Sequence, residues 1–257
     1  MSDGPVKRPV LDYLIGMDLG LSADYTAMIV LQRSTVDEKR PTYEALKIQM
    51  IRRITVPVLV TRILNFVSKP PLAYHTTLIV ERNQVGPGVI HPIYDAFKNA
   101  DSPARLISGM VTAGDTVNRD GYLVNVPKRD LVAAVSVVLE TERIKIPRML
   151  ARSSDLEKQL RRFTMTKEAG GRTKFGADLS SVHDDLVMAA GWALWWGENN
   201  KKPYVPVLTA EQQIQAAVTS EDPNYAAQQY WRAVRKFGAT DAPLKMGGRF
   251  TPQSRKP

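Results

Sequence analysis

Four acidic residues lie at positions where a carboxylate is either unusual or able to come close to other carboxylates. Asp18 is the single acid inside a short apolar run that Gly20 closes, and Glu81 is the last residue of a second apolar run. Asp184 and Asp185 directly precede a third apolar segment. An ionised side chain on a buried strand is costly unless it is paired or holds a metal ion. These acids are therefore the first candidates for chemistry.

Each acid also has an ordinary structural explanation. An isolated Asp at a strand end commonly caps a turn, and Ser181, three residues before Asp184, gives the pattern of a helix N-terminus, where the helix dipole favours negative charge. The chemical explanation requires that the fold brings the acids to one point, since like charges cannot all stay ionised there without cations. Oxygen ligands without cysteine favour Mg²⁺ or Mn²⁺. Two such ions about 3.5–4 Å apart form the arrangement that hydrolyses phosphodiesters.

The expected order of elements would bring two of these acids together. Apolar runs of strand length alternate with amphipathic segments of helix length, and this order predicts an α/β fold with a mixed central sheet flanked by helices. In such a sheet Asp18 and Glu81 lie side by side if their strands are neighbours. The expected strands are residues 13–18, 26–31, 43–54, 76–81 and 106–110; the expected helices are residues 56–67 and 89–98, one from Pro127, a short one from Ser154, and residues 186–196. A hairpin of residues 163–167 and 172–175 precedes the last helix.

The last helix is apolar nearly all round and is therefore expected to be buried. Its tryptophans, Trp192, Trp195 and Trp196, are predicted to lie in the core and not to stack on bases. Beyond it the composition changes, so we predict a domain of residues 1–199 and a C-terminal helical extension of residues 200–257 that ends in a disordered basic tail.

The charge balance favours a polyanionic partner. The 257 residues include 35 Lys and Arg against 26 Asp and Glu, a net charge of +9. The chain has no cysteine, which excludes disulfides and Cys-ligated metals, and no apolar run long enough to span a bilayer. We expect a soluble, cytoplasmic protein with no membrane partner. The candidate contacts to the phosphates of a polyanionic partner are the hairpin residues Arg161, Arg162, Lys167, Arg172 and Lys174, with Lys128 and Arg129 at a helix start.

Four stretches together resemble a known family. They are residues 16–20 with 24–27, residues 79–83 with Gly86, residues 126–128, and the most specific one, His183-Asp184-Asp185-Leu186-Val187. They resemble the ribonuclease-H-like nuclease domain of viral large terminase subunits, which cut concatemeric DNA during genome packaging. The resemblance covers roughly residues 12–197.

The resemblance implies a function for each matching acid. Asp18, Glu81, and Asp184 or Asp185 or both would hold two Mg²⁺ or Mn²⁺ ions over double-stranded DNA. His183 would either assist at the metal site or bond the backbone at the helix start. The family's packaging ATPase motif, Gly-x-x-x-x-Gly-Lys-Ser/Thr, does not occur in the sequence. The chain is therefore expected to be a nuclease-only member, which its start at Met1 favours, or an excised domain. A separate packaging ATPase, the small terminase subunit or the portal would be its partners.

Three other interpretations share some of these residues. A Holliday-junction resolvase would have the same acids and act as a two-fold dimer. A non-catalytic DNA-binding or docking module of a packaging machine would keep the fold, although the acids at all three points argue against it. The run from Gly16 to Gly20 also resembles the first phosphate loop of actin-like ATPases and sugar kinases. Those proteins need a second phosphate loop and a duplicated domain, and the sequence shows neither.

Overall fold

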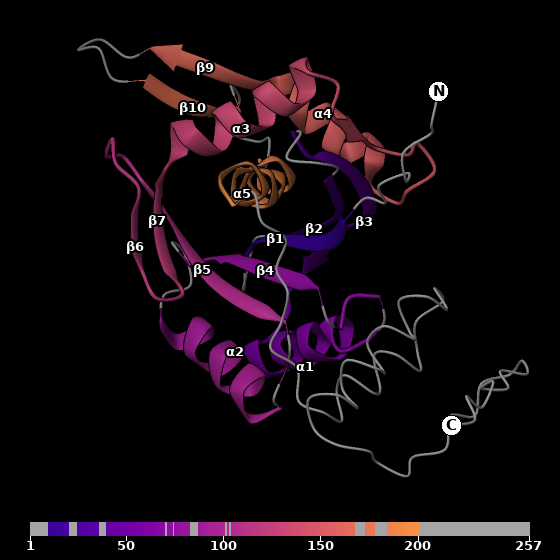
Figure 1. The fold of residues 1–257 in the computed structure, drawn as a ribbon. Helices are drawn as coiled ribbons and strands as arrows, with labels where there is room; N and C mark the ends of the chain where they lie inside the picture. Colours follow the sequence, from indigo (N-terminus) through magenta and orange to yellow (C-terminus); the bar gives the residue numbers. More distant parts are fainter. Residues whose placement is uncertain are drawn as a thin grey trace, which may run out of the picture. The chain divides into compact units, whose positions relative to one another are not determined.

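The computed structural model describes residues 10–20, 25–35, 40–69, 71–73, 75–82, 87–100, 102, 104–167, 173–177 and 184–200. Within them, eight strands form one sheet in the order β6-β7-β5-β4-β1-β2-β3-β8, and β9 and β10 form a separate ribbon (Figure 1). The strands are β1 (Val10–Asp18), β2 (Tyr25–Thr35), β3 (Thr42–Arg52), β4 (Thr76–Glu81), β5 (Arg105–Thr112), β6 (Asn118–Asp120), β7 (Leu123–Pro127), β8 (Ile144–Lys145), β9 (Phe163–Lys167) and β10 (Thr173–Ala177). The helices are α1 (Val56–Val67), α2 (Pro87–Asn99), α3 (Lys128–Glu140), α4 (Ser153–Arg162) and α5 (Asp185–Asn199).

The sheet is mixed, as the sequence predicts. β1 pairs antiparallel with β2, and β2 with β3, whereas the pairs β1–β4, β4–β5 and β5–β7 are parallel. The expected bounds of α1 and β4 agree with the structure, and the expected hairpin is the β9–β10 ribbon. The mixed α/β fold and its helices are therefore confirmed.

Three short strands escaped the sequence analysis. β6 is the exposed tripeptide Asn-Arg-Asp, and β8 is only two residues long, so neither has an apolar pattern to find. β7 ends at Pro127, which the sequence analysis assigned to the following helix. The structure makes Pro127 both the last residue of β7 and the N-cap of α3.

Two apolar layers cover the two faces of the sheet. Side chains alternate along a strand, so Leu14 of β1 packs in the layer of α3 and α5, while Ile15 and Met17 pack in the layer of α1 and α2. α5 lies between the sheet and the α3–α4 pair, with α1 and α2 on the opposite face (Figure 1). It is buried from Leu186 to Gly197. Its tryptophans lie in the core, as predicted.

Gly16 allows α5 to lie directly against β1. A Cβ atom built at Gly16 would be 1.9 Å from the carbonyl oxygen of Ala189 and 3.1 Å from the backbone nitrogen of Ala193. Both are backbone atoms of a buried helix, which cannot move aside by a side-chain rotation. Only glycine fits here, and the resulting close approach sets the distance between the strand that carries Asp18 and the helix that begins at Asp185.

The C-terminal end of α5 is held by a buried arginine. Arg33 of β2 donates to both carboxylate oxygens of Asp12, at 2.7 and 2.6 Å, and to the carbonyl oxygens of Gly197 at 2.9 Å and Asn200 at 2.5 Å. Both side chains of this ion pair are 1% exposed. The last carbonyls of a helix lack partners within the helix and carry partial negative charge, so a buried cation stabilises them. A second arginine–carboxylate pair involves the residue after Gly197: Arg143 donates to both carboxylate oxygens of Glu198.

Asp12→Asn is expected to destabilise the protein by about 3 kcal/mol or more, because it leaves the buried Arg33 cation without its counter-charge. Urea denaturation of the two proteins measures this difference. Lys145→Met is the matched control, since it breaks the exposed ion pair with Glu44 and should cost less than about 1 kcal/mol. Equal losses for the two variants would contradict the expectation.

The predicted boundary near residue 200 stays a prediction, because residues 201–257 lie outside the described part of the chain. Among the described helices, none is long and apolar enough to cross a membrane.

Candidate active site

Asp18 and Glu81 end two adjacent parallel strands. β1 pairs with β4 in the register Gly16 to Ile79 and Met17 to Val80, so the following residues, Asp18 and Glu81, reach the same edge of the sheet. Each is 9% exposed. The two strands are neighbours, which is the condition under which the sequence analysis expected the two acids to lie side by side. Both carboxylates stand at the carboxyl ends of their strands, where α/β proteins commonly place their sites.

Asp184 and Asp185 reach the same place from the helix layer. Asp184 is the N-cap of α5 and Asp185 is its first residue. The helix crosses the sheet at Gly16, two residues before Asp18, so its N-terminal turn lies near the strand ends. Both acids shift the pKa of Asp18 and of Glu81 through their charge. We call Asp18, Glu81, Asp184 and Asp185 the acidic cluster.

Lys128 lies at the acidic cluster. It is the first residue of α3, which follows β7, and its Nζ is 3.3 Å from Oδ2 of Asp184. The two side chains are 31% and 29% exposed. Its positive charge also lowers the pKa of Asp18 and Glu81. A residue that the sequence analysis assigned to DNA phosphates is thus positioned beside the candidate catalytic acids.

Burial and crowding make the acidic cluster unfavourable when all its members are ionised. Burial raises the pKa of Asp18 well above its ordinary value, and the charges of Glu81, Asp185 and Asp184 raise it further. Burial also raises the pKa of Glu81, partly offset by a hydrogen bond from Trp192 and by the charge of Lys128. A divalent cation would reverse these shifts, because it stabilises the ionised forms.

The acids of the cluster interact electrostatically, yet no three His, Asp or Glu side chains of the described residues converge at the spacing of a metal site. Electrostatic interaction and metal coordination depend on different distances. The charges act over several ångströms, whereas metal ligands must lie within about 2.0–2.6 Å of the ion. The fit to a metal therefore rests on the donor chemistry, four carboxylates on rigid elements, and not on a preformed coordination shell.

The stability of the metal-free protein is expected to fall as the pH rises above about 4, the ordinary pKa of an unfolded Asp or Glu. The raised pKa of Asp18 and Glu81 means that the folded state still holds protons which the unfolded chain has released. The stability that Asp18 and Glu81 contribute is fully present below their pKa in the unfolded chain. It is lost as the pH rises through their pKa in the folded protein. Urea denaturation in a chelator from about pH 4 to about pH 8 measures this loss. Asp18→Asn should reduce the slope, and an unchanged slope would count against the raised pKa.

The other predicted cations pair with acids outside the acidic cluster, are exposed, or lie where side chains are not described. Arg129 pairs with Asp115, and Arg161 donates to Glu157 at 2.8 Å from the exposed end of α4, where Arg162 is also exposed. Lys167 and Lys174 belong to β9 and β10, whose backbone alone is described. The predicted residues outside the described part of the chain are His183 and Arg172, and with them Asp24, Asn83 and Gly86 of the matching stretches.

Trp192 is the site residue whose polar role the sequence analysis missed. It is fully buried, as predicted, and its indole Nε1 also donates a hydrogen bond of 2.9 Å to Oε2 of Glu81. One signal was present in the sequence. Trp192 follows Asp185 by seven residues, about two helical turns, and so lies on the same side of the helix.

Solved structures with a similar fold include nuclease domains of viral terminases. The large terminase nuclease of thermophilic phage G20c, solved with bound cobalt, matches with a TM-score of 0.51 at 18% identity, over 73% of this chain and 82% of that one. The Thermus phage P74-26 large terminase nuclease domain has a TM-score of 0.49 at 16% identity, over 76% and 83%. The manganese-soaked human cytomegalovirus terminase nuclease domain has a TM-score of 0.43 at 12% identity, over 72% and 84%. At these identities the first match shows a shared fold.

Comparison with curated proteins finds no significant match. The sequence does match the family described as "Terminase RNaseH-like domain" over residues 15–195, a span that includes the whole acidic cluster. The mixed sheet order, the strand-end acids and the acidic start of the buried last helix agree with this match, and the chain therefore belongs to the terminase RNaseH-like domain family.

Proposed function

We propose that this protein is a divalent-metal-dependent endonuclease that cuts concatemeric double-stranded DNA during viral genome packaging. The observation that carries the proposal is the acidic cluster, in which strand ends of β1 and β4 and the N-terminus of α5 deliver four carboxylates to one edge of the sheet. Membership of the terminase RNaseH-like domain family and the fold shared with the large terminase nuclease of phage G20c support this interpretation.

The residues that would hold the metal are Asp18, Glu81 and one or both of Asp184 and Asp185. Carboxylate oxygens fit Mg²⁺ and Mn²⁺, and the phage G20c neighbour was solved with bound cobalt. When two such ions are bound, they activate a water molecule and stabilise the leaving oxygen of the phosphodiester. His183 directly precedes Asp184 in the sequence, so we propose that it assists there.

The chain's own cations would position the DNA. Lys128 stands beside Asp184, so its ammonium can hold a phosphate oxygen of the strand to be cut. Arg129 follows it at the start of α3, half-exposed. Contacts to phosphates fix the position of a duplex and read no sequence, so we propose cleavage with little sequence preference. The other proposed contacts are Arg161 and Arg162 at the end of α4, with Lys167, Arg172 and Lys174 of the predicted hairpin.

The packaging machine would supply the partners. We propose that a packaging ATPase, the small terminase subunit or the portal delivers the DNA, and that residues 200–257 serve docking to one of them. Deleting residues 201–257 separates this role from cleavage. The shortened chain should still cut naked plasmid.

Supercoiled plasmid provides the test of the proposed activity. With Mn²⁺ or Mg²⁺ the protein is expected to nick and then linearise the plasmid, and a chelator should stop both steps. Plasmid that stays intact with either metal would overturn the proposal and favour a non-catalytic docking module. Synthetic four-way junctions in the same experiment test the resolvase alternative, since paired symmetric cuts in junctions with uncut plasmid would favour it.

A further inference from the structure

Trp192 joins the helix of the acidic cluster to one of its strand acids. Its indole Nε1 is 2.9 Å from Oε2 of Glu81, and the bond is buried, because Trp192 is 0% and Glu81 9% exposed. A buried carboxylate with a donor on one oxygen has a fixed orientation. The hydrogen bond therefore holds Oε2 of Glu81 against the protein.

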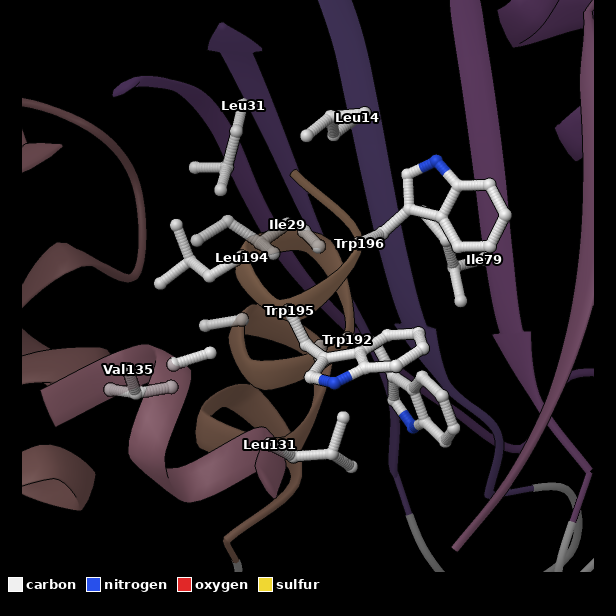
Figure 2. Close-up of a cluster of buried hydrophobic side chains, with 14 of the residues drawn as sticks. Leu14, Ile29, Leu31, Ile79, Leu131, Val135, Trp192, Leu194, Trp195 and Trp196 are labelled. Carbon is white, nitrogen blue, oxygen red and sulfur yellow. The ribbon is translucent and has the colours of Figure 1, made fainter. Parts of the chain in front are cut away.

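The indole ring has little freedom to leave this position. Gly109 of β5 is the register partner of Glu81, and a Cβ atom built there would lie 2.5–2.8 Å from carbons of the Trp192 ring. The absence of a side chain at Gly109 thus makes the space that the ring fills. Trp195 packs edge-on against the same ring, with centroids 6.2 Å apart at 86°, and both rings extend from the side of α5 that faces away from Val135 of α3 (Figure 2).

We propose that Trp192 is a positioning residue for metal binding: its N–H holds one oxygen of Glu81 and leaves the other for the divalent cation. The inference rests on the proposed function. Trp192 and Asp185 are about two turns apart on one helix, about 10.5 Å along its axis. α5 therefore fixes two carboxylates of the acidic cluster, Asp185 through its own backbone and Glu81 through the indole.

A neutral donor suits this task better than a charged one. An Arg or Lys partner would orient Glu81 equally well but would cancel part of the negative charge that attracts the cation. The indole N–H carries no net charge, so it orients Glu81 without offsetting the charge of the carboxylate. Partners that orient a ligand in this way commonly change metal affinity by about 10–100-fold when they are removed.

The test compares Mn²⁺ binding by Trp192→Phe, Trp196→Phe and the unmodified protein, measured as free Mn²⁺ by electron paramagnetic resonance. Phenylalanine keeps an aromatic ring in the core and removes the donor. Trp192→Phe should weaken Mn²⁺ binding by about tenfold or more, whereas Trp196→Phe, a matched loss of a buried indole on the same helix, should leave it within about twofold. Urea denaturation of both variants accounts for any loss of core packing.

Combination with Glu81→Gln separates positioning from general damage. If Trp192 acts through Glu81, adding Trp192→Phe to Glu81→Gln should weaken Mn²⁺ binding no further. Unchanged Mn²⁺ affinity in Trp192→Phe, or fully additive losses in the double variant, would overturn the inference. Failure of the unmodified protein to bind Mn²⁺ at all would instead overturn the proposed function.

A measurement on the unmodified protein needs no substitution. The indole N–H resonance of Trp192, assigned through its contact with Gly109, should shift as Mg²⁺ is added and should saturate with the binding curve, because the ion draws charge from Glu81. A resonance that does not respond while Mg²⁺ binds would overturn the inference even if Trp192→Phe does not fold.

Discussion

Asp18→Asn is expected to abolish cleavage while leaving the protein folded. The substitution keeps the size of the side chain and removes the carboxylate on which Glu81, Asp185 and Asp184 all act through their charge. Loss of a group that stabilises charge in the transition state costs on the order of 10²–10³-fold in rate, and loss of a metal ligand should cost at least as much. Plasmid cleavage in Mn²⁺ measures the rate.

The stability of the same variant should change in the opposite direction. Asp18 is buried among like charges, so its neutral replacement should make the metal-free protein as stable as the parent or more stable at neutral pH. Asp95→Asn is the matched control, because Asp95 is an exposed acid of α2 on the other face of the sheet. It should cut plasmid at the parent rate. If the Asp18→Asn protein cuts plasmid at the parent rate, Asp18 does not belong to the active site.

Gly16→Ala is expected to destabilise the protein by about 3 kcal/mol or more, the upper range for an overpacked core. The added methyl would lie 1.9 Å from the carbonyl oxygen of Ala189, so β1 and α5 must separate. Urea denaturation measures the loss. Gly88→Ala is the control, since a Cβ there meets nothing within 4 Å and alanine is the better residue in a helix. It should be neutral or slightly stabilising.

The same substitution should also weaken metal binding. Separation of α5 from β1 moves Asp185 away from Asp18, so the Mn²⁺ affinity of any folded Gly16→Ala protein should fall. Two equally stable glycine variants, or a Gly16→Ala protein with unchanged Mn²⁺ affinity, would show that the close approach at Gly16 does not set the geometry of the acidic cluster.

The parts of the fold that the sequence predicted are those with a strong local pattern. The apolar run of β4 ends at Glu81 and is buried at every residue, and α1 follows a helical spacing from Val56 to Val67. The adjacency of β1 and β4 was only a condition in the sequence analysis, and the pairing of the two strands supplies it. β6 and β8 lacked any such pattern, because they are only three and two residues long. β8 also pairs with β3, a strand distant in the sequence.

The residues of the candidate site also divide into those with a local sequence pattern and those without one. Strand-end acids and an acidic helix start are visible as residue types, so Asp18, Glu81 and Asp184 could be found. Lys128 contacts Asp184, which is 56 positions away in the sequence. Trp192 contacts Glu81, which is 111 positions away. A lysine at a helix start and a tryptophan in an apolar helix look the same in the sequence whether or not such a partner exists.

The buried Arg33 at the far end of α5 has a mechanical consequence. In the proposed packaging machine, a pull on the chain at Asn200 would first meet the carbonyl bonds from Arg33 and the Asp12 pair behind them. α5 is 15 residues long, about 22 Å, so this anchor stands a full helix length from Asp185. Tension applied there would be borne by β1 and β2 before it could displace the acids at the other end.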